Sequence, residues 1–366
     1  MMELYVFNMD FEFQGVIDIY RSFSFERSYH SIGKMLLVLD FTQDVLELLQ
    51  DEFIIVKRED LNKPCEAAII TNRTIETIGN QVVFKVGGFS LNWFLYRRFV
   101  WGQQRYSGDI DHVLKQFVIK NAITPDNINR VIPGLAVSSS KTFGTTEEVS
   151  TGKQLSNIFE EIGIKHEVGW CVLFDLKNKK FVFDVYQGLD LTPDQAENEP
   201  VVFSVQNENL PSQSYLHSID DFANMALVAG AGEGPARKTE VINDEIAGWK
   251  RRELYVDARD ISDEDADGTV IPDDTYKKLL VSRGNSKLAE SKVVETLDSE
   301  IYHNSQYVYK RDYDLGDKVL IESEWGVHLK TRITKIAEIY ENGMLTIQPE
   351  FGTNIPDLKN LMMGGR

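Results

Sequence analysis

Short runs of alternating hydrophobic and polar residues dominate the first quarter of the chain, and such alternation is typical of β-strands. The runs cover residues 11–20, 22–29, 33–40 and 66–86. Residues 42–50 carry instead the spacing of a short helix. Several short antiparallel strands separated by turns predict a small barrel or sandwich over residues 1–95.

Residues 99–200 change to a mixed helical and extended pattern. Apolar residues of the segment 109–120 recur at i, i+3, i+4, i+7 and i+8, which places them on one face of a helix. A second helix is predicted over 151–162, with Thr151 as its cap. Residues 166–187 alternate along two arms around a polar turn, which predicts a β-hairpin.

The β pattern returns over residues 201–234 and again over 305–352. Residues 235–304 interrupt it with one strand, an acidic loop and two helical stretches. The strand and the helices are predicted over residues 250–259, 275–284 and 286–300. The layout is therefore a β domain, a mixed domain and a β domain with an insertion, followed by a tail at 353–366.

Charge and cysteine content narrow the possible functions. The 366 residues hold 57 acidic and 39 basic side chains, a net charge of −18, which repels nucleic acid and argues against sequence-independent binding to it. Cys65 and Cys171 are too few for a disulfide framework and form no C-x-x-C pair, so we expect reduced, buried thiols and folding in a cytoplasm. We see no secretory signal and no run of ~20 apolar residues, so no membrane segment is expected.

The spacing of residues along the chain does not match the usual catalytic and nucleotide-binding motifs. The glycine-rich stretch 230–234 is followed by Pro235, where a dinucleotide-binding loop needs a third glycine and the start of a helix. The sequence holds no phosphate loop, no H-E-x-x-H and no G-x-S-x-G motif. Paired carboxylates for glycoside hydrolysis stay open, because 57 acids offer many pairs.

One acidic loop matches the spacing of a calcium site. Asp263, Asp265 and Asp267 occupy positions 1, 3 and 5 of such a loop, Gly268 position 6 and Asp274 position 12. Against calcium, the last ligand is Asp instead of the longer Glu, a proline lies inside the loop, and the preceding segment has an extended pattern. Both a calcium loop and a solvated acidic loop remain open, and no cofactor is required.

A second acidic cluster precedes the β pattern of the C-terminal part. Asp312, Asp314 and Asp317 surround Gly316 immediately before the apolar run "KVLIE". Asp and Gly together favour a turn, and no further ligand is near in sequence. We therefore predict a turn that feeds a barrel strand, and not a metal site.

The order of these segments resembles the tail-tip (baseplate) hub family of siphophages and prophages, which is related to the trimeric hub proteins of contractile-tail baseplates. The segments that carry the resemblance are "SFSFERSYHSIGKMLLVLDF", "NMALVAGAGEG", "RRELYVDARDIS" with "YKKLLVSRGNSKLAE", "YDLGDKVLIE" and "RITKIAEIYENGMLTIQPEFG". Together they cover most of the chain.

The resemblance implies a β-rich α+β fold with two small antiparallel β-barrels. The first barrel would span 1–98, and the discontinuous second would combine 201–234 with 305–352. Residues 99–200 and the insertion 235–304 would form mixed α/β peripheral domains.

By the same resemblance the chain is a non-enzymatic virion protein that assembles as a homotrimer, so that six barrels form a pseudo-sixfold ring. Its expected partners are the distal tail protein, the tail tube, the tape-measure protein and the tip or receptor-binding proteins. The expected location is the virion tail tip, after folding in the bacterial host cytoplasm. Two other functions remain open. One is a tail-associated cell-wall or polysaccharide hydrolase with a carboxylate pair in the mixed domain. The other is a module that binds host glycan through Trp101 and Trp249.

Overall fold

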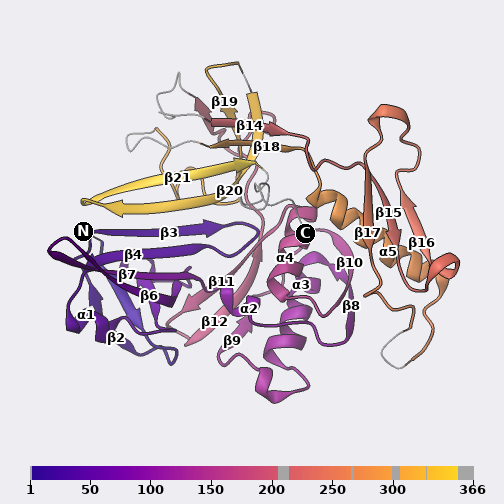
Figure 1. Cartoon of the computed structure of the whole chain (residues 1–366). Coiled ribbons are helices and arrows are strands. Elements are labelled where there is room, and N and C mark those ends of the chain that lie inside the picture. The colour runs from indigo at the N-terminus through magenta and orange to yellow at the C-terminus, as the bar shows by residue number, and fades with distance from the viewer. Residues whose placement is uncertain (1, 205–213, 265–267, 299–305, 327, 353–366) are drawn as a thin grey trace. The chain divides into compact units, whose positions relative to one another are not determined.

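Figure 1 shows the computed structural model of the chain, which describes residues 2–204, 214–264, 268–298, 306–326 and 328–352. The chain divides into two compact units. Unit 1 comprises Met1–Trp93, Cys171–Leu216 and Glu295–Arg366, and unit 2 comprises Phe94–Trp170 and His217–Val294. Within the described ranges, no helix has the length and apolar character needed to cross a bilayer.

Unit 1 is built on one sheet of thirteen strands. Its N-terminal strands are β1 (Leu4–Phe7), β2 (Phe13–Ile17), β3 (Ser22–Ser28), β4 (Lys34–Asp40), β5 (Ile54–Lys57), β6 (Ala68–Ile78) and β7 (Gln81–Ser90). Its later strands are β13 (Val202–Ser204), β14 (Ser214–Ser218), β18 (Val294–Asp298), β19 (Lys318–Glu322), β20 (His328–Glu341) and β21 (Met344–Gly352). The order is β14-β18-β21-β20-β3-β4-β7-β6-β5-β1-β2, with β19 and β13 branching from β20.

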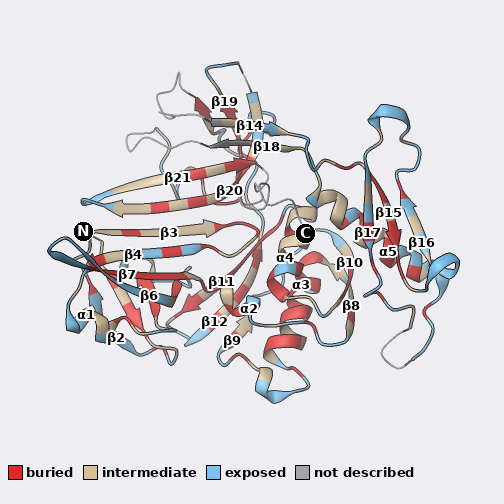
Figure 2. Ribbon diagram, in the orientation of Figure 1, coloured by how far each residue is buried: buried red, intermediate tan, exposed pale blue. Residues whose placement is uncertain are grey.

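Alternation along the N-terminal strands builds a first hydrophobic core. In β4, Met35, Leu37 and Leu39 are buried while the residues between them are exposed or half-buried (Figure 2), so one face of the strand packs inward. These side chains cluster with those of β1, β3, β5, β6 and β7. The predicted short helix is α1 (Gln43–Leu48), and η1 (Arg58–Asp60) is a short 3-10 turn.

A second hydrophobic core lies on the same sheet. It includes Val319 and Ile321 of β19, Ile333 and Ile336 of β20, and Phe203 of β13. The two halves are continuous because β3 pairs with β20, as the indigo and yellow strands of Figure 1 show. The prediction of a β-rich α+β fold is confirmed. Between the described strands no pairing closes either half into a barrel.

Two smaller features of unit 1 test the sequence patterns. The predicted hairpin 166–187 is formed by β11 (Gly169–Asp175) and β12 (Lys180–Tyr186). The helix predicted over 286–300 is wrong in its second half, because β18 pairs there with β21, from Thr296↔Gly352 to Asp298↔Glu350. Pairing with a distant strand outweighs the local helical spacing at that point.

Unit 2 holds most of the helices. Its elements up to residue 170 are α2 (Trp93–Tyr96), β8 (Gln103–Asp109), α3 (Ile110–Val118), η2 (Ile119–Ile123), η3 (Ile128–Arg130), β9 (Leu135–Val137), β10 (Thr145–Thr151) and α4 (Leu155–His166). The apolar face predicted over 109–120 is the buried face of α3. Thr151 is not a helix cap, because it ends β10 opposite Gln103 of β8; α4 begins at Leu155.

A three-stranded sheet covered by one long helix completes unit 2. The elements are β15 (Met225–Ala229), η4 (Gly234–Ala236), β16 (Thr239–Ile242), η5 (Gly248–Lys250), β17 (Glu253–Asp257) and α5 (Asp273–Glu290). The sheet order is β16-β15-β17, and α5 packs against it. Gly284 allows this close approach, because a Cβ there would lie 2.3 Å from Ile242 Cδ1 and 2.6 Å from Val228 Cγ2.

Candidate functional site

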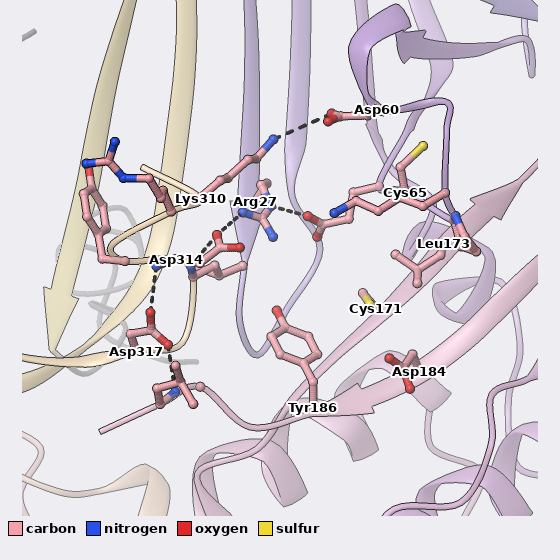
Figure 3. A pocket seen from close by; sticks show the side chains of 18 of the residues that line it. Arg27, Asp60, Cys65, Cys171, Leu173, Asp184, Tyr186, Lys310, Asp314 and Asp317 are labelled. Carbon is pink, nitrogen blue, oxygen red and sulfur yellow. Dashed lines mark hydrogen bonds and ion pairs between the residues drawn. The ribbon is translucent and has the colours of Figure 1, made fainter. Parts of the chain in front are cut away.

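A cavity of about 500 Å³ in unit 1 is lined by many charged side chains (Figure 3). Arg27 enters it from β3, and Lys57 from β5. Cys65 and Tyr186 line it from the loop after η1 and from the end of β12, and the turn around Asp314 closes another side. The lining therefore combines residues nearly 290 positions apart in sequence, such as Arg27 and Asp314.

Arg27 is the centre of one charge network. Its Nη1 donates to the Tyr309 hydroxyl at 2.7 Å and to Asp314 Oδ1 at 2.5 Å, and its Nε contacts Glu66 Oε2. Burial alone would lower the pKa of Arg27, but Glu66, Tyr309 and Asp314 hold it well above its usual range. The guanidinium is a permanent cation whose hydrogen bonds join β3 to the C-terminal part of the sheet.

Lys57 and Glu338 form a second, fully buried ion pair. Lys57 Nζ lies 2.5 Å from Glu338 Oε2, and the two side chains are 4% and 1% exposed. The Tyr309 hydroxyl donates to the other carboxylate oxygen at 3.0 Å, and Asp60 lies 3.1 Å from Lys57 Nζ. Burial tends to raise the pKa of Glu338, but Lys57 and Lys310 lower it to about 2. The pair connects β5 to β20.

The predicted turn before the strand "KVLIE" is confirmed and borders this cavity. Asp317 Oδ2 accepts the Asp314 N–H at 2.7 Å, and Oδ1 accepts the Leu189 N–H at 2.7 Å. Gly316 has φ +93°, and a Cβ there would lie 2.3 Å from the Tyr29 ring. Asp312 binds Arg311 at 2.7 Å. The three aspartates hold the turn and neighbouring cations in place.

Both cysteines line this cavity as buried thiols outside any disulfide, as the sequence predicts. Burial raises the pKa of the Cys65 thiol to about 12, so it is protonated and unreactive at neutral pH. The Tyr186 hydroxyl is buried and makes no hydrogen bond in the described part of the chain. The cavity thus holds ion pairs and a protonated thiol, which is a bracing arrangement more than a catalytic one.

Two buried carboxylates of the mixed domain are held in ion pairs. Asp111 pairs with Lys115 at 2.7 Å and Glu148 pairs with Lys165 at 2.8 Å. Burial tends to raise the pKa of Glu148, but its hydrogen bond with His166 and the charge of Lys165 bring it below its usual value. A glycosidase acid needs a raised pKa, so the lowered pKa of Glu148 does not suit that role.

The candidate calcium ligands are only partly described. Asp265 and Asp267 lie outside the described residues. Asp263 Oδ2 lies 3.1 Å from Lys238 Nζ, and Asp274 belongs to the first turn of α5. The Ile271 N–H donates to Asp263 O at 2.8 Å, which brings the two ends of the loop together. Among the described residues no group of three or more His, Cys, Asp or Glu side chains is placed to hold a metal, and the calcium site stays a prediction.

The two candidate tryptophans are both exposed. Trp101 is 58% exposed, and the Arg130 guanidinium lies 4.1 Å from its ring centroid, over its face. Trp249 in η5 is 103% exposed. Trp249 therefore presents its whole indole to solvent.

Sequence reasoning missed the buried ion-paired residues Arg27, Lys57 and Glu338. A signal existed for two of them. Lys57 ends the buried run "IIVK", and Glu338 follows Ile336 at the same inward-facing spacing in β20. A charged residue at an inward position of an apolar strand indicates a buried partner.

Comparison with solved structures identifies the fold as one that phage tail proteins share. A 43 kDa tail protein of prophage MuSo2 from Shewanella oneidensis is 10% identical with a TM-score of 0.57, over 95% of this chain and 98% of that one. The tail protein from Neisseria meningitidis MC58 is 9% identical with a TM-score of 0.54, over 96% of each chain. The prophage tail protein gp18 from Listeria monocytogenes EGD-e is 11% identical with a TM-score of 0.53, over 99% and 97%.

The family follows from the sequence itself. Residues 3–353 match the family described as Siphovirus ReqiPepy6 Gp37-like protein, and the chain belongs to this family. No curated protein sequence matches the chain. The resemblance to a siphophage family predicted from the sequence is confirmed.

Proposed function

We propose that the chain is a structural hub of a phage tail tip, and that three copies form a ring with pseudo-sixfold symmetry. The observation that carries the proposal is the pair of hydrophobic cores on one continuous sheet of unit 1. One chain thus supplies two β modules, each with its own core. Three chains would supply six modules, which suits a sixfold tube.

The two modules would take equivalent places around the ring axis. Strands of neighbouring chains would complete the barrels that the strands of a single chain leave open. The ring would join the tail tube and the distal tail protein to the tip, beside the tape-measure and receptor-binding proteins. The net charge of −18 supports a channel through which DNA passes without adhering. The charge networks around Arg27 and Lys57 support a bracing role, because they fix β3 and β5 to the C-terminal half of the sheet.

A non-enzymatic role accords with the family and with the ion pairs of the buried carboxylates Asp111, Glu148 and Glu338. Native mass spectrometry of the purified chain, alone and mixed with its tail neighbours, tests the proposal. A trimer, in either sample, supports the hub. A chain that stays monomeric in both samples and degrades cell-wall polysaccharide supports the hydrolase instead.

Binding of a host glycan is the second candidate, and the fully exposed indole of Trp249 favours it. Aromatic side chains with a free face are suited to stacking on sugar rings. A binding assay with host cell-wall polysaccharide separates the two functions. Retention of the chain that is lost in Trp249→Ala supports the glycan-binding module, whereas no retention removes it.

A further inference from the structure

Large exposed side chains gather in one part of unit 2, around the short turn η3. Arg130 lies at their centre, because its Nη2 donates to the Phe99 carbonyl oxygen and its guanidinium lies 4.1 Å from the Trp101 ring centroid. Arg98 Nε donates in turn to the Arg130 carbonyl oxygen at 2.8 Å. The arginine–aromatic patch comprises the half-buried Arg98 and Arg130 and the exposed side chains of Tyr96, Phe99, Trp101 and Ile128.

This patch is basic, although the chain as a whole has a net charge of −18. Residues 93–105 and 127–132 hold four arginines and no acid. Asp126 is next in sequence, but its carboxylate is paired with Lys120 at 2.7 Å. The patch therefore attracts acidic groups, in contrast to the chain as a whole.

The arginines of the patch have donors to offer to a carboxylate. Among the described residues, Arg98 and Arg130 bind only carbonyl and amide oxygens. Burial lowers the pKa of Arg98, and the charges of Arg97 and Arg130 lower it further, so a bound anion would relieve repulsion between these cations. The guanidinium fork matches a carboxylate, and Arg, Trp and Tyr are the residue types most enriched among binding hot spots.

A compact acidic loop lies on unit 1 of the same chain, between β12 and β13. Residues 187–200 hold four acids and no base. Gln195 fixes the shape of the loop, because its Nε2 donates to the carbonyl oxygens of Thr192 at 3.0 Å and Asn198 at 2.9 Å. Its Oε1 accepts the N–H groups of Glu197 and Asn198, both at 2.7 Å. A loop held in this way loses little entropy when it binds.

Two carboxylates of this acidic loop are available to a partner. Glu197 and Glu199 are exposed, and no described cation is paired with either of them. Asp194 is exposed as well but is paired with Lys330. Leu189, at one end of the loop, is 55% exposed. The loop therefore presents carboxylates together with an apolar side chain.

We propose that the acidic loop 187–200 of one copy binds the arginine–aromatic patch of a second copy. The inference rests on the proposed function and names one contact of its ring. Identical chains that join head to tail need two different, complementary surfaces on each chain, and this chain carries both. Copies with a net charge of −18 repel one another, so their contact needs local charge complementarity of this kind. Carboxylates of the loop bind the guanidinium groups, and the loop covers the Trp101 indole.

Photo-crosslinking locates the contact. The full chain with p-benzoyl-phenylalanine in place of the exposed Ala196 is mixed with the ¹⁵N-labelled parent chain and irradiated. We expect products that join an unlabelled peptide containing position 196 to a labelled peptide containing residues 96–101 or 128–130. The same group in place of Met344, which is 64% exposed at the start of β21, is the matched control and should not reach those residues. The label distinguishes links between copies from links within one copy.

Sedimentation equilibrium adds the energetic test. Glu197→Lys should raise the dissociation constant for self-association about tenfold or more, because it places like charges together. Glu59→Lys is the matched control, since Glu59 is exposed and has no cation paired with it among the described residues. Both changes make the chain less acidic to the same extent, so weaker general repulsion alone would strengthen self-association in both variants.

The aromatic side of the contact is tested in the same assay. Trp101→Ala should raise the dissociation constant about tenfold, while Trp249→Ala, at the other exposed tryptophan of unit 2, should change it less than about twofold. Thermal midpoints close to that of the parent show that the variants are folded.

Each experiment is run on the chain alone and on the chain mixed with its tail neighbours. A trimer with crosslinks elsewhere, links only within one copy or only to another tail protein, or equal dissociation constants for Glu197→Lys and Glu59→Lys each overturn this contact and leave the hub intact. A monomer in both samples overturns the contact and the hub together.

Discussion

Neutralising Glu338 tests the bracing role of the buried ion pair. The substitution Glu338→Gln keeps the shape of the side chain and removes its charge, which leaves Lys57, only 4% exposed, without its closest partner. The pKa of Glu338 is lowered from 4.5 to about 2, and at ~1.4 kcal/mol per pKa unit this corresponds to about 3 kcal/mol of stabilisation. Removing one partner of a buried ion pair is expected to cost a similar ~3–5 kcal/mol of folding free energy. Asp60 still lies near Lys57 in the variant, so we expect a loss at the lower end of this range.

Hydrogen exchange followed by mass spectrometry measures this loss in the affected strands. A change of about 3 kcal/mol speeds exchange about 100-fold in peptides of β5 and β20, while peptides of unit 2 serve as an internal reference. Glu341→Gln is the matched control, because it makes the same chemical change at an exposed position of β20. Replacement of both partners, Lys57→Met with Glu338→Leu, should restore much of the protection. Equal exchange in Glu338→Gln and Glu341→Gln would refute the reasoning.

Three further predictions concern pH, packing and calcium. A carboxylate with a lowered pKa stabilises the folded state above its unfolded pKa of 4.5. The contribution of Glu338 should therefore be complete above about pH 5 and lost as the pH falls toward 2. The stability of unit 1 should accordingly fall less steeply with acid in Glu338→Gln than in the parent chain. Gly284→Ala should lower the stability of unit 2 by about 1–3 kcal/mol in urea unfolding, because its Cβ would overlap Ile242 at 2.3 Å; an unchanged midpoint would contradict the packing. If the acidic loop binds calcium, millimolar calcium should raise the melting temperature of the EDTA-treated chain, and Asp263→Asn should abolish the rise; equal melts with and without calcium would remove the site.

Local periodicity accounts for the parts of the fold that could be predicted. The N-terminal strands, the helix α3 and the hairpin of β11 and β12 follow from side-chain spacing, because each buries one face. The turn at Gly316 follows from its Asp and Gly residues. These features depend on neighbours within a few residues, which the sequence displays directly.

Long-range pairing accounts for what the sequence could not reveal. The union of both halves in one sheet depends on β3 meeting β20, more than 300 residues later. The cavity depends on the same meeting, because Arg27 and Lys57 find their partners only after it has formed. β18 is a strand for the same reason, since its residues have helical spacing but pair with β21.

The copy number and position of the chain in assembled tails test the central claim most directly. A cryo-electron-microscopy reconstruction of the tail tip should show three copies, with the β1–β7 module and the β19–β21 module alternating at six equivalent places around the tube axis. A single copy, six copies, or two modules at unrelated distances from the axis would contradict the account.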